Sequence, residues 1–472
     1  MFEPVSSRVN LPQVEEKILN WWRENSIFER SVEARKGGPL FVLYEGPPTA
    51  NGNPGIHHVL SRVFKDIIPR YKVMKGHYAP RWAGWDTHGL PVELEVEKQL
   101  GLSSKPEIEQ YGIDKFNARC RESVFTYLKD WTALTERIGF WVDMEHPYIT
   151  MENDYIESVW NAIKEMWQKG LIYQGYRVTP HCPRCGTSLS SHEVAQGYQD
   201  DTEDPSVYIK FKISIPSLQD SDIRDWLRES IIRSDKPAYL LAWTTTPWTL
   251  PGNTALAVSA DAEYAMVEVD GEYLILASAR LQQLELGDAP VVARIIGSDL
   301  ADLRYEPLFN PSDFEVPVST MGTIEKAGKP SSDILWKEGG ILNYPVIAGD
   351  FVSMEDGTGI VHIAPAYGEI DYEMGKDKGL DFVHTVDLQG NIIGSYPFSG
   401  KFVKDADKDI LADLEQRNLL FRSETIRHTY PFCWRCDSPL LYYAKQTWYI
   451  KTTAVKDSLI AGNNEINWYP EH

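Results

Sequence analysis

Long apolar runs are absent from this sequence of 472 residues, which contains no stretch of 18 consecutive apolar residues. A helix that crosses a membrane needs about 20 of them, so none is expected. The first segment, MFEPVSSRVNLPQVEEK, has an early acid and no apolar centre of the kind that a secretory signal requires. We therefore expect a cytoplasmic protein with no membrane partner.

Positive charge is also scarce. Lysine and arginine number 47 against 68 acids, a formal net charge of −21. This excludes a protein that wraps nucleic acid with its whole surface, because phosphates would be repelled. Two interpretations stay open for residues 61–82, a phosphate-facing surface or a solvated helix face. There a single acid stands among six cations: Arg62, Lys65, Arg70, Lys72, Lys75 and Arg81.

Cysteine is rare, with five residues, which excludes a disulfide framework in a cytoplasmic chain. Four of the five form two Cys-x-x-Cys pairs, Cys182 with Cys185 and Cys433 with Cys436. Each pair supplies two thiolates from one tight turn, and four thiolates make a structural zinc site. We predict one structural Zn²⁺ ion per chain. The alternatives are two unrelated pairs, or a redox pair, which is disfavoured because neither pair opens a helix after a strand.

The first third of the chain has the pattern of an α/β domain. Residues 39–45, PLFVLYE, are typical of a strand, and Gly46-Pro47-Pro48 ends it. Apolar residues then recur at helical spacing until Gly76. A strand, a polar turn and a helix open a doubly wound sheet, in which ligands bind at the carboxyl ends of the strands. Further helices are predicted over residues 12–31, 115–137 and 156–169.

A β-rich block follows, from residue 206 to about residue 384. In it Asp270-Gly271 joins two strand-like runs, which is typical of a hairpin. The helical pattern returns after residue 391, for example over residues 404–420. The cysteine pairs flank this block, so an insertion whose two ends lie together would unite them. Because 472 residues exceed one ordinary core, we predict the segments 1–199, 200–390 and 391–472.

Two strings in the first segment resemble a known family. Residues 46–60, GPPTANGNPGIHHVL, resemble the histidine-motif region of class I aminoacyl-tRNA synthetases. Residues 84–93, GWDTHGLPVE, resemble the isoleucyl-tRNA synthetases in particular. The residue types suit phosphates, since glycines let the backbone approach, a helix N-terminus favours anions and histidines donate to phosphate oxygens. No Gly-x-x-x-x-Gly-Lys-Ser/Thr string is present, which disfavours a P-loop enzyme.

The resemblance implies roles for five residues of this segment. His57 and His58 would contact the phosphates of ATP, which binds with Mg²⁺. Gly46 and Pro47 would line the pocket, and Asp86 would hold the ammonium group of isoleucine. Without the resemblance, Asp86 is more typical of a residue that caps a helix or a turn.

The histidine motif departs from the family pattern in one respect. The family has His-x-Gly-His, whereas this chain has Gly55-Ile56-His57-His58. His58 keeps its place in the motif. We expect His57 to rotate beside His58 and take over the missing donor role; the alternative is an impaired synthetic site.

Two strings in the β-rich block resemble the editing domain of the same family. They are residues 243–253, WTTTPWTLPGN, and residues 357–365, GTGIVHIAP, with GEID following at 368–371. Hydroxyls suit a terminal adenosine and a polarised water, and an unpaired carboxylate suits an ammonium group. The resemblance implies that Asp371 anchors the amino group, that His362 lines the acyl pocket, and that Thr246 and Asn253 position the ester, with Thr244 and Thr245 also in contact with the substrate.

A second, hydrolytic site would answer a physical problem. Isoleucine and valine differ by one methylene, which is worth only about 1–3 kcal/mol in an apolar pocket, a limit established for this very type of enzyme. A site that admits the valyl ester and excludes the isoleucyl ester would supply the missing fidelity.

The resemblance implies an α/β fold, the N-terminal half of a Rossmann-type class I synthetase catalytic domain with an inserted β-rich editing domain and a zinc-binding connection. The expected partners are isoleucine, ATP and tRNA(Ile), and we expect a monomer. No Lys-Met-Ser-Lys-Ser string occurs, so the chain is predicted to be a fragment. Two other classes stay open, a freestanding hydrolase of mischarged tRNA and a zinc-stabilised nucleic-acid-binding module, which the net charge disfavours.

Overall fold

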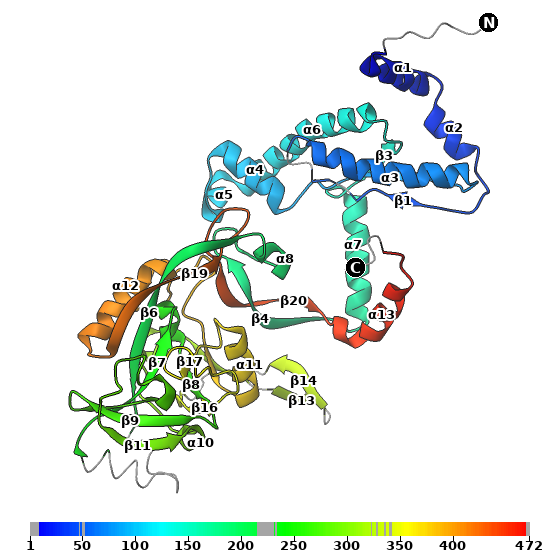
Figure 1. Cartoon of the computed structure of the whole chain (residues 1–472). Coiled ribbons are helices and arrows are strands. Elements are labelled where there is room, and N and C mark those ends of the chain that lie inside the picture. Colours follow the sequence, from blue (N-terminus) through cyan, green and yellow to red (C-terminus); the bar gives the residue numbers. More distant parts are fainter. Residues whose placement is uncertain are drawn as a thin grey trace, which may run out of the picture. The chain divides into compact units, whose positions relative to one another are not determined.

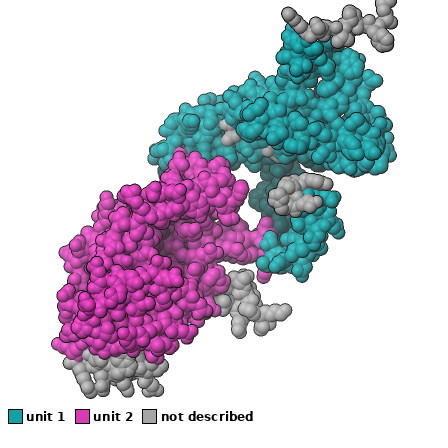
Figure 2. Space-filling model, in the orientation of Figure 1, with its two compact units in different colours: residues 1–172, 452–472 teal, residues 173–451 magenta. Residues whose placement is uncertain are grey.

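The computed structural model describes residues 9–46, 48–49, 52–214, 231, 234–321, 323–326, 329–334, 337–338 and 342–468. The chain forms two compact units, shown in Figure 2. Unit 1 is Met1–Ile172 with Thr452–His472, and unit 2 is Tyr173–Lys451. The segment boundaries at 199 and 390 stay a prediction. Among the described helices, none is both long enough and apolar enough to cross a bilayer.

Unit 1 is an α/β unit built on a parallel sheet, as the sequence predicted (Figure 1). Its strands lie in the order β1 (Leu43–Tyr44), β2 (Arg81–Trp85) and β3 (Asp143–Ile149). α3 connects β1 to β2, so the turn after β1 leads into the N-terminus of this helix. The helices are α1 (Leu11–Glu24), α2 (Ile27–Glu33), α3 (Ile56–Met74), α4 (Leu90–Leu100), α5 (Lys105–Tyr111), α6 (Ile113–Arg137), α7 (Asn153–Gln168) and α13 (Lys456–Asn464).

The predicted helix over residues 12–31 is wrong in one respect, because it is two helices, α1 and α2. The side-chain amide of Asn25 donates to the Trp21 carbonyl oxygen at 2.9 Å, where the first helix ends. Ser26 then adopts a left-handed backbone with a φ of 47°. Asn and Ser bond to nearby backbone groups and so compete with helix continuation. The strand predicted over residues 39–45 is also shorter than expected, since β1 contains only Leu43 and Tyr44.

α3 forms as predicted and ends at Met74, before Gly76 with its φ of 90°. The buried residues of this helix are Arg62 and Pro69. Most of its apolar residues are instead exposed to between 40 and 86% in the described part of the chain: Ile56, Leu60, Val63, Phe64, Ile67, Ile68 and Met74. An exposed apolar face of this length is typical of a surface that another segment or chain covers.

Unit 2 is β-rich, as predicted, and its main sheet has nine strands among the residues that the structure describes. The predicted hairpin is confirmed: Asp270 and Gly271, both at positive φ, join antiparallel strands β9 and β10. Leu240, Leu256 and Ile275 are fully buried in its core. The main path runs β11 (Val291–Ile296), β9 (Glu263–Val269), β10 (Glu272–Ala277), β7 (Ala238–Thr244), β17 (Ile360–Ile363), β8 (Ala255–Val258) and β16 (Val346–Ala348).

Two strands that connect the β-rich block to the cysteine pairs lie side by side, as expected if the block is an insertion. β6 (Tyr198–Lys212) and β19 (Leu420–Pro431) form a long antiparallel pair in which Tyr198 faces Pro431 (Figure 1). β6 also pairs with β7, which attaches the ribbon to the main sheet. The helix predicted over residues 404–420 is α12 (Val403–Gln416), and it ends early because β19 begins at Leu420.

The remaining elements of unit 2 complete smaller sheets and turns. A three-stranded sheet contains β20 (Leu441–Ile450), β4 (Ile172–Cys182) and β5 (Thr187–Ser188). Others are β12 (Val318–Thr320), β13 (Thr323–Lys326), β14 (Lys329–Ile334), β15 (Lys337–Glu338), β18 (Asp381–Val383), α8 (Ser191–Val194), α10 (Gly297–Leu300) and α11 (Glu369–Lys378). Short 3-10 helices are Pro247–Gly252, Ser278–Arg280 and Pro311–Phe314 in unit 2, and Thr452–Val455 in unit 1.

Candidate functional site

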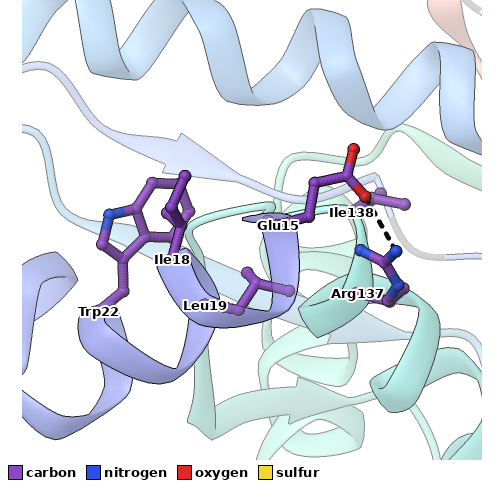
Figure 3. A pocket seen from close by; sticks show the side chains of 7 residues that line it. Glu15, Ile18, Leu19, Trp22, Arg137 and Ile138 are labelled. Atoms are coloured by element: carbon purple, nitrogen blue, oxygen red, sulfur yellow. Dashed lines mark hydrogen bonds and ion pairs between the residues drawn. The ribbon is translucent and has the colours of Figure 1, made fainter. Parts of the chain in front are cut away.

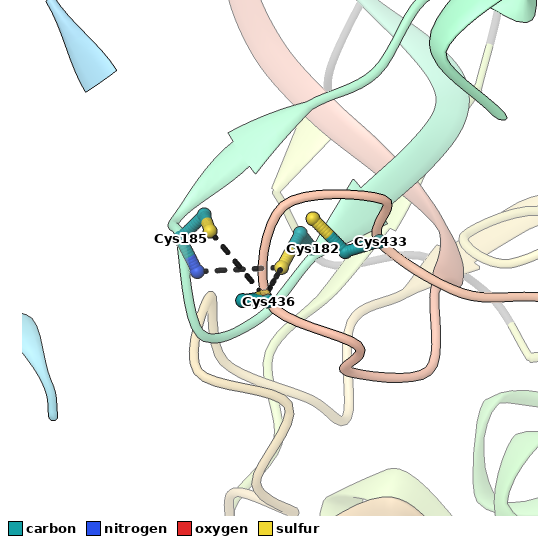
Figure 4. A group of neighbouring side chains, drawn as sticks. All are labelled: Cys182, Cys185, Cys433 and Cys436. Atoms are coloured by element: carbon teal, nitrogen blue, oxygen red, sulfur yellow. Dashed lines mark hydrogen bonds between the residues drawn. The ribbon is translucent and has the colours of Figure 1, made fainter. Parts of the chain in front are cut away.

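The four cysteine sulfurs of the two pairs lie within 4.8 Å of one another (Figure 4). A zinc ion with Zn–S bonds of about 2.3 Å places its four sulfurs roughly 3.8 Å apart. The Sγ of Cys436 lies 3.5 Å from the Sγ of both Cys182 and Cys185. Cys182 and Cys433 are fully buried, and the other two are at most partly exposed. The set therefore fits a closed, tetrahedral metal site.

The two cysteine turns have the same construction. In the first, the Gly186 N–H donates to the Cys182 carbonyl oxygen at 2.9 Å, and in the second the Asp437 N–H donates to the Cys433 carbonyl oxygen at 2.8 Å. Gly186 and Asp437 both directly follow the second cysteine of their pair, and both have positive φ. In each pair, this repeated turn orients both sulfurs towards the sulfurs of the other pair.

The turn after β1 begins at a buried acid. Glu45 is 3% exposed, and its Oε1 accepts from the Lys65 ammonium group at 2.7 Å. Lys65 also donates to the Gly46 carbonyl oxygen at 3.1 Å, and the Tyr148 hydroxyl donates to the Glu45 carbonyl oxygen. These bonds fix Gly46 at the carboxyl end of the strand, where a ligand of a doubly wound sheet binds. Pro47 lies outside the described residues.

Asp86 follows β2 and faces the same turn. Its Oδ2 accepts from the Thr49 hydroxyl at 3.0 Å, and its backbone N–H donates to the Pro48 carbonyl oxygen at 3.2 Å. Its Oδ1 lies 3.9 Å from the Nδ1 of His88, and the side chain is 34% exposed. The carboxylate thus bridges the two strand ends and retains access to solvent, as a group that binds a ligand requires.

The two histidines lie side by side at the start of α3. The Nδ1 of His58 accepts from the Gly55 N–H at 2.8 Å, and the ring centroids of His57 and His58 are 3.8 Å apart. A Cβ added to Gly55 would lie 2.7 Å from the Cε1 of His57, so this ring folds back over the glycine. Burial, and secondly the His57 ring, lower the pKa of His58. The rings of His57 and His58 thus lie side by side; the donor role expected for His57, and the contact of both rings with phosphates, stay predictions.

The cation-rich stretch does not form one continuous surface. Arg62 and Arg81 are only 4 and 2% exposed, and their guanidinium groups lie over aromatic rings. Lys65 and Arg70 are engaged in ion pairs with acids of unit 1. The interpretation of these residues as a phosphate-facing surface is therefore wrong for the two buried arginines, and burial lowers the pKa of both guanidinium groups.

A chain of hydroxyl groups links the threonine-rich turn to His362. The Thr244 Oγ1 accepts from the Thr246 N–H at 3.1 Å, and the Thr246 Oγ1 lies 3.3 Å from the Oγ1 of both Thr244 and Thr249. Thr249 donates to the Thr246 carbonyl oxygen at 2.8 Å, and its Oγ1 lies 2.9 Å from the His362 Nε2. Because a hydroxyl has one proton, the Nε2–H of His362 donates in this second bond.

Thr249 is a candidate site residue that the sequence prediction missed. A signal for it was present, since it lies three residues after Thr246. In a 3-10 helix this spacing places two side chains on the same face. Residues 247–252 form such a helix, so the two hydroxyls meet.

The pKa values of His362 and Asp371 are strongly shifted. Burial lowers the pKa of His362 to about 4, so its imidazole is neutral near pH 7. Burial raises the pKa of Asp371 to about 6, although its Oδ2 accepts from the Ala364 N–H at 2.9 Å. A Cβ on Gly368 would lie 2.6 Å from the Asp371 carboxyl carbon, so the glycine makes room for this carboxylate. A partly buried acid with a raised pKa is typical of a functional site.

Asn253 and Thr245 differ in their surroundings. Asn253 is 3% exposed, its Nδ2 donates to the Ala255 carbonyl oxygen at 2.9 Å, and its Oδ1 accepts from the Tyr305 hydroxyl at 2.6 Å. Both ends of the amide are thus bonded within the protein, so Asn253 holds the turn in place. Its expected role in positioning the ester stays a prediction. Thr245 lies half-buried in the turn itself.

A separate cavity of about 530 Å³ lies in unit 1 between α1 and the end of α6 (Figure 3). Ile18, Leu19 and Trp22 line it, and an ion pair of 2.9 Å between Glu15 and Arg137 lies at its side. Its lining contains none of the predicted site residues.

A parallel sheet with two histidines at the start of its first crossover helix, joined to a β-rich unit with a second polar site, fits a class I tRNA synthetase. The model of the family tRNA synthetases class I (I, L, M and V) matches residues 17–472, so the chain belongs to this family. Isoleucine--tRNA ligase of Dehalococcoides mccartyi is 63% identical over the whole chain, which covers 45% of that relative. Isoleucine--tRNA ligase of Thermus thermophilus is 48% identical over the whole chain, which covers 41% of it.

The chain thus spans less than half the length of these curated relatives. Two solved structures also match. One is GlLeuRS-CP1, with 17% identity and a TM-score of 0.35 over 46% of this chain and 96% of that one. The other is the P. knowlesi cytosolic leucyl-tRNA synthetase editing domain, with 12% identity and a TM-score of 0.33 over 48% of this chain and 98% of that one. At these scores neither match supports an inference.

Proposed function

We propose that this chain is the part of an isoleucine--tRNA ligase that carries half of the synthetic site and a complete editing site. The whole protein activates isoleucine with ATP and Mg²⁺, transfers it to tRNA(Ile), and hydrolyses valyl-tRNA(Ile) formed in error. The identity of 63% over the whole chain supports this choice of amino acid. The observation that carries the editing activity is the hydroxyl chain from Thr246 to His362.

In the synthetic site, the proposal assigns binding roles to five residues. His57 and His58 donate to the phosphates of ATP at the N-terminus of α3, where the helix dipole favours anions. Gly46 and Pro47 line the pocket, and the carboxylate of Asp86 holds the ammonium group of isoleucine. The solvent access of Asp86 supports its role, since 34% of its side chain is exposed.

In the editing site, Asp371 binds the α-ammonium group of the ester. Its pKa of about 6 leaves it charged at neutral pH, so it attracts this cation. The neutral ring of His362 limits the acyl pocket, which admits the valyl side chain and excludes the larger isoleucyl one. The Thr246 hydroxyl, with Thr244 and Thr245 in the same turn, orients the ester and the attacking water.

We propose Zn²⁺ as the metal of the four-cysteine set. When bound, this ion joins two turns that lie far apart in the sequence, and its binding energy contributes to folding. Four protein ligands leave no open position, so the site is structural. The ligands are Cys182, Cys185, Cys433 and Cys436.

Deacylation of preformed aminoacyl-tRNA tests the editing activity. With the chain in excess, we expect valyl-tRNA(Ile) to lose its amino acid and isoleucyl-tRNA(Ile) to keep it. Asp371→Ala removes the ammonium partner and should lower the rate at least tenfold. Asp377→Ala, in the same helix and largely exposed, is the matched control and should retain the activity. Equal rates for the wild type and Asp371→Ala would refute the proposed site.

A further inference from the structure

Asp407 of α12 is a buried acid that contacts the threonine-rich turn from another element. Its side chain is 5% exposed, and its Oδ1 accepts from the Trp248 backbone N–H at 2.8 Å. Trp248 is the second residue of the 3-10 helix Pro247–Gly252, and every residue of this helix is buried. The first N–H groups of a helix have no acceptor within it. Asp407 therefore provides an acceptor that the turn itself lacks.

Trp248 connects the two halves of the proposed editing site. Along the chain it lies between Thr246 and Thr249, which belong to the hydroxyl chain. Its indole ring packs edge-on against Tyr367, with ring centroids 5.0 Å apart. Tyr367 lies in the loop that leads into α11 and Asp371. A shift of Trp248 would therefore disturb both the hydroxyls and the carboxylate that binds the ammonium group.

A carboxylate at this position is unfavourable for folding. Burial raises the pKa of Asp407 to about 7, although the nearby Lys404 and the Trp248 N–H oppose this. Lys404 forms an ion pair with Asp204 of β6, and the His428 Nε2 lies 2.9 Å from the other oxygen of Asp204. An apolar side chain of similar size would fill the position without desolvating a charge. The acid therefore indicates a need for a hydrogen-bond acceptor at this point.

We infer that Asp407 is a positioning residue for the hydrolysis of the mischarged ester. By holding the Trp248 backbone, it sets where the Thr246 and Thr249 hydroxyls lie relative to the ester that Asp371 binds. This inference rests on the editing activity proposed above. Asp407 lies outside both strings that resemble the editing domain, so the sequence motifs do not point to it.

Single-turnover deacylation of valyl-tRNA(Ile) by the chain tests the inference. In Asp407→Leu the acceptor is lost, and we expect the saturating rate to fall at least tenfold while the half-saturating concentration changes less than twofold. In Asp407→Asn the amide oxygen still accepts from Trp248, so we expect a rate within threefold of the wild type. Asp405→Leu, at an exposed position of the same helix, is the matched control and should leave the rate unchanged.

Hydrogen exchange of the Trp248 amide gives a readout that does not depend on activity. Exchange should be faster in Asp407→Leu than in the wild type and unchanged in Asp407→Asn. If Asp407→Leu does not fold, Asp407→Ala takes its place. A wild-type rate in both acceptor-free variants would overturn the inference, as would equal losses in the Asn and Leu variants. A wild type that does not deacylate would instead refute the proposed function.

Discussion

The pKa of His58 provides a test of how the exchanged motif Gly55-Ile56-His57-His58 places its two histidine rings. Burial lowers its pKa, and the ring of His57, 3.8 Å away, lowers it further. His57→Gly removes the second influence, so we expect the pKa of His58 to rise towards its ordinary value. The matched control is Ile56→Ala, because Ile56 is 86% exposed and should not affect the ring. An NMR titration measures this pKa, and a value unchanged in His57→Gly would contradict the observed placement of the two rings.

We expect the ionised carboxylate of Asp371 to destabilise the folded protein, although the proposed editing activity requires this charge. Its folded pKa of about 6 lies above the ordinary 3.8, so the folded state binds the proton more tightly and is destabilised as the carboxyl ionises. Asp371→Asn keeps an oxygen for the Ala364 N–H and removes the charge. At pH 7.5 we expect the free energy of unfolding of this variant to be about 1–3 kcal/mol larger than that of the wild type, so the variant is more stable. We also expect it to be inactive in deacylation.

Urea unfolding at two pH values measures this effect of Asp371. The sign follows from the two pKa values: the penalty is absent below pH 3.8, where both states are protonated, and complete above pH 6. The gain in Asp371→Asn should therefore shrink towards zero near pH 3.5. Asp377→Asn, whose side chain is largely exposed, should show no such gain. A variant less stable than the wild type at pH 7.5 would show that the charged carboxylate contributes to folding.

Site residues could be predicted from the sequence where a short motif contains all the groups that act together. The four cysteines belong to that class, because two short turns determine how each pair presents its sulfurs. Asp407 and Asn253 do not, since their roles depend on partners that only the fold brings close. Asp407, for example, lies 159 residues from the Trp248 whose N–H it accepts. No local pattern contains such a contact.

At the scale of structural elements, the prediction succeeded where periodicity alone decides. The long helices α6 and α7 begin within three residues of their predicted starts and end within one residue of their predicted ends. The break between α1 and α2 was missed, because the conflict lies in the side-chain bonding of Asn25 and not in the apolar pattern. The strand over residues 39–45 was overestimated, because pairing with β2 and not residue propensity sets its ends.

The pair of cysteine turns supports a prediction at this same scale. We expect one zinc ion per chain by elemental analysis of purified protein. Cys433→Ser removes one ligand from a closed site, so the metal should be lost and the melting temperature should fall by several degrees. Cys120→Ser is the matched control: this cysteine is half-buried in α6 of unit 1, far along the chain from both turns. A wild-type protein without metal would contradict the proposed zinc site, and so would a Cys433→Ser variant as stable as the wild type.

At the scale of the whole chain, the two units differ in how much of a site each contains. Unit 2 holds the hydroxyl chain, Asp371 and Asp407 in one compact body with a large core. Unit 1 has a sheet of three strands, and its α3 exposes an apolar face in the described part of the chain. The sequence contains no Lys-Met-Ser-Lys-Ser string, the loop that closes on ATP in the family that it resembles. We therefore expect the two activities to separate in this chain.

The chain alone should deacylate valyl-tRNA(Ile) and give no ATP–pyrophosphate exchange above background. A lysine loop neutralises phosphate charge in the transition state, and a single electrostatic group of this kind often contributes about 10²–10³ in rate. Both assays use one preparation, so deacylation shows that the protein is folded. His58→Gln is the matched control for exchange, because it removes a proposed phosphate donor. Substantial exchange in the wild type that disappears in His58→Gln would show a synthetic site complete within these 472 residues, and would overturn the proposal that this site is split.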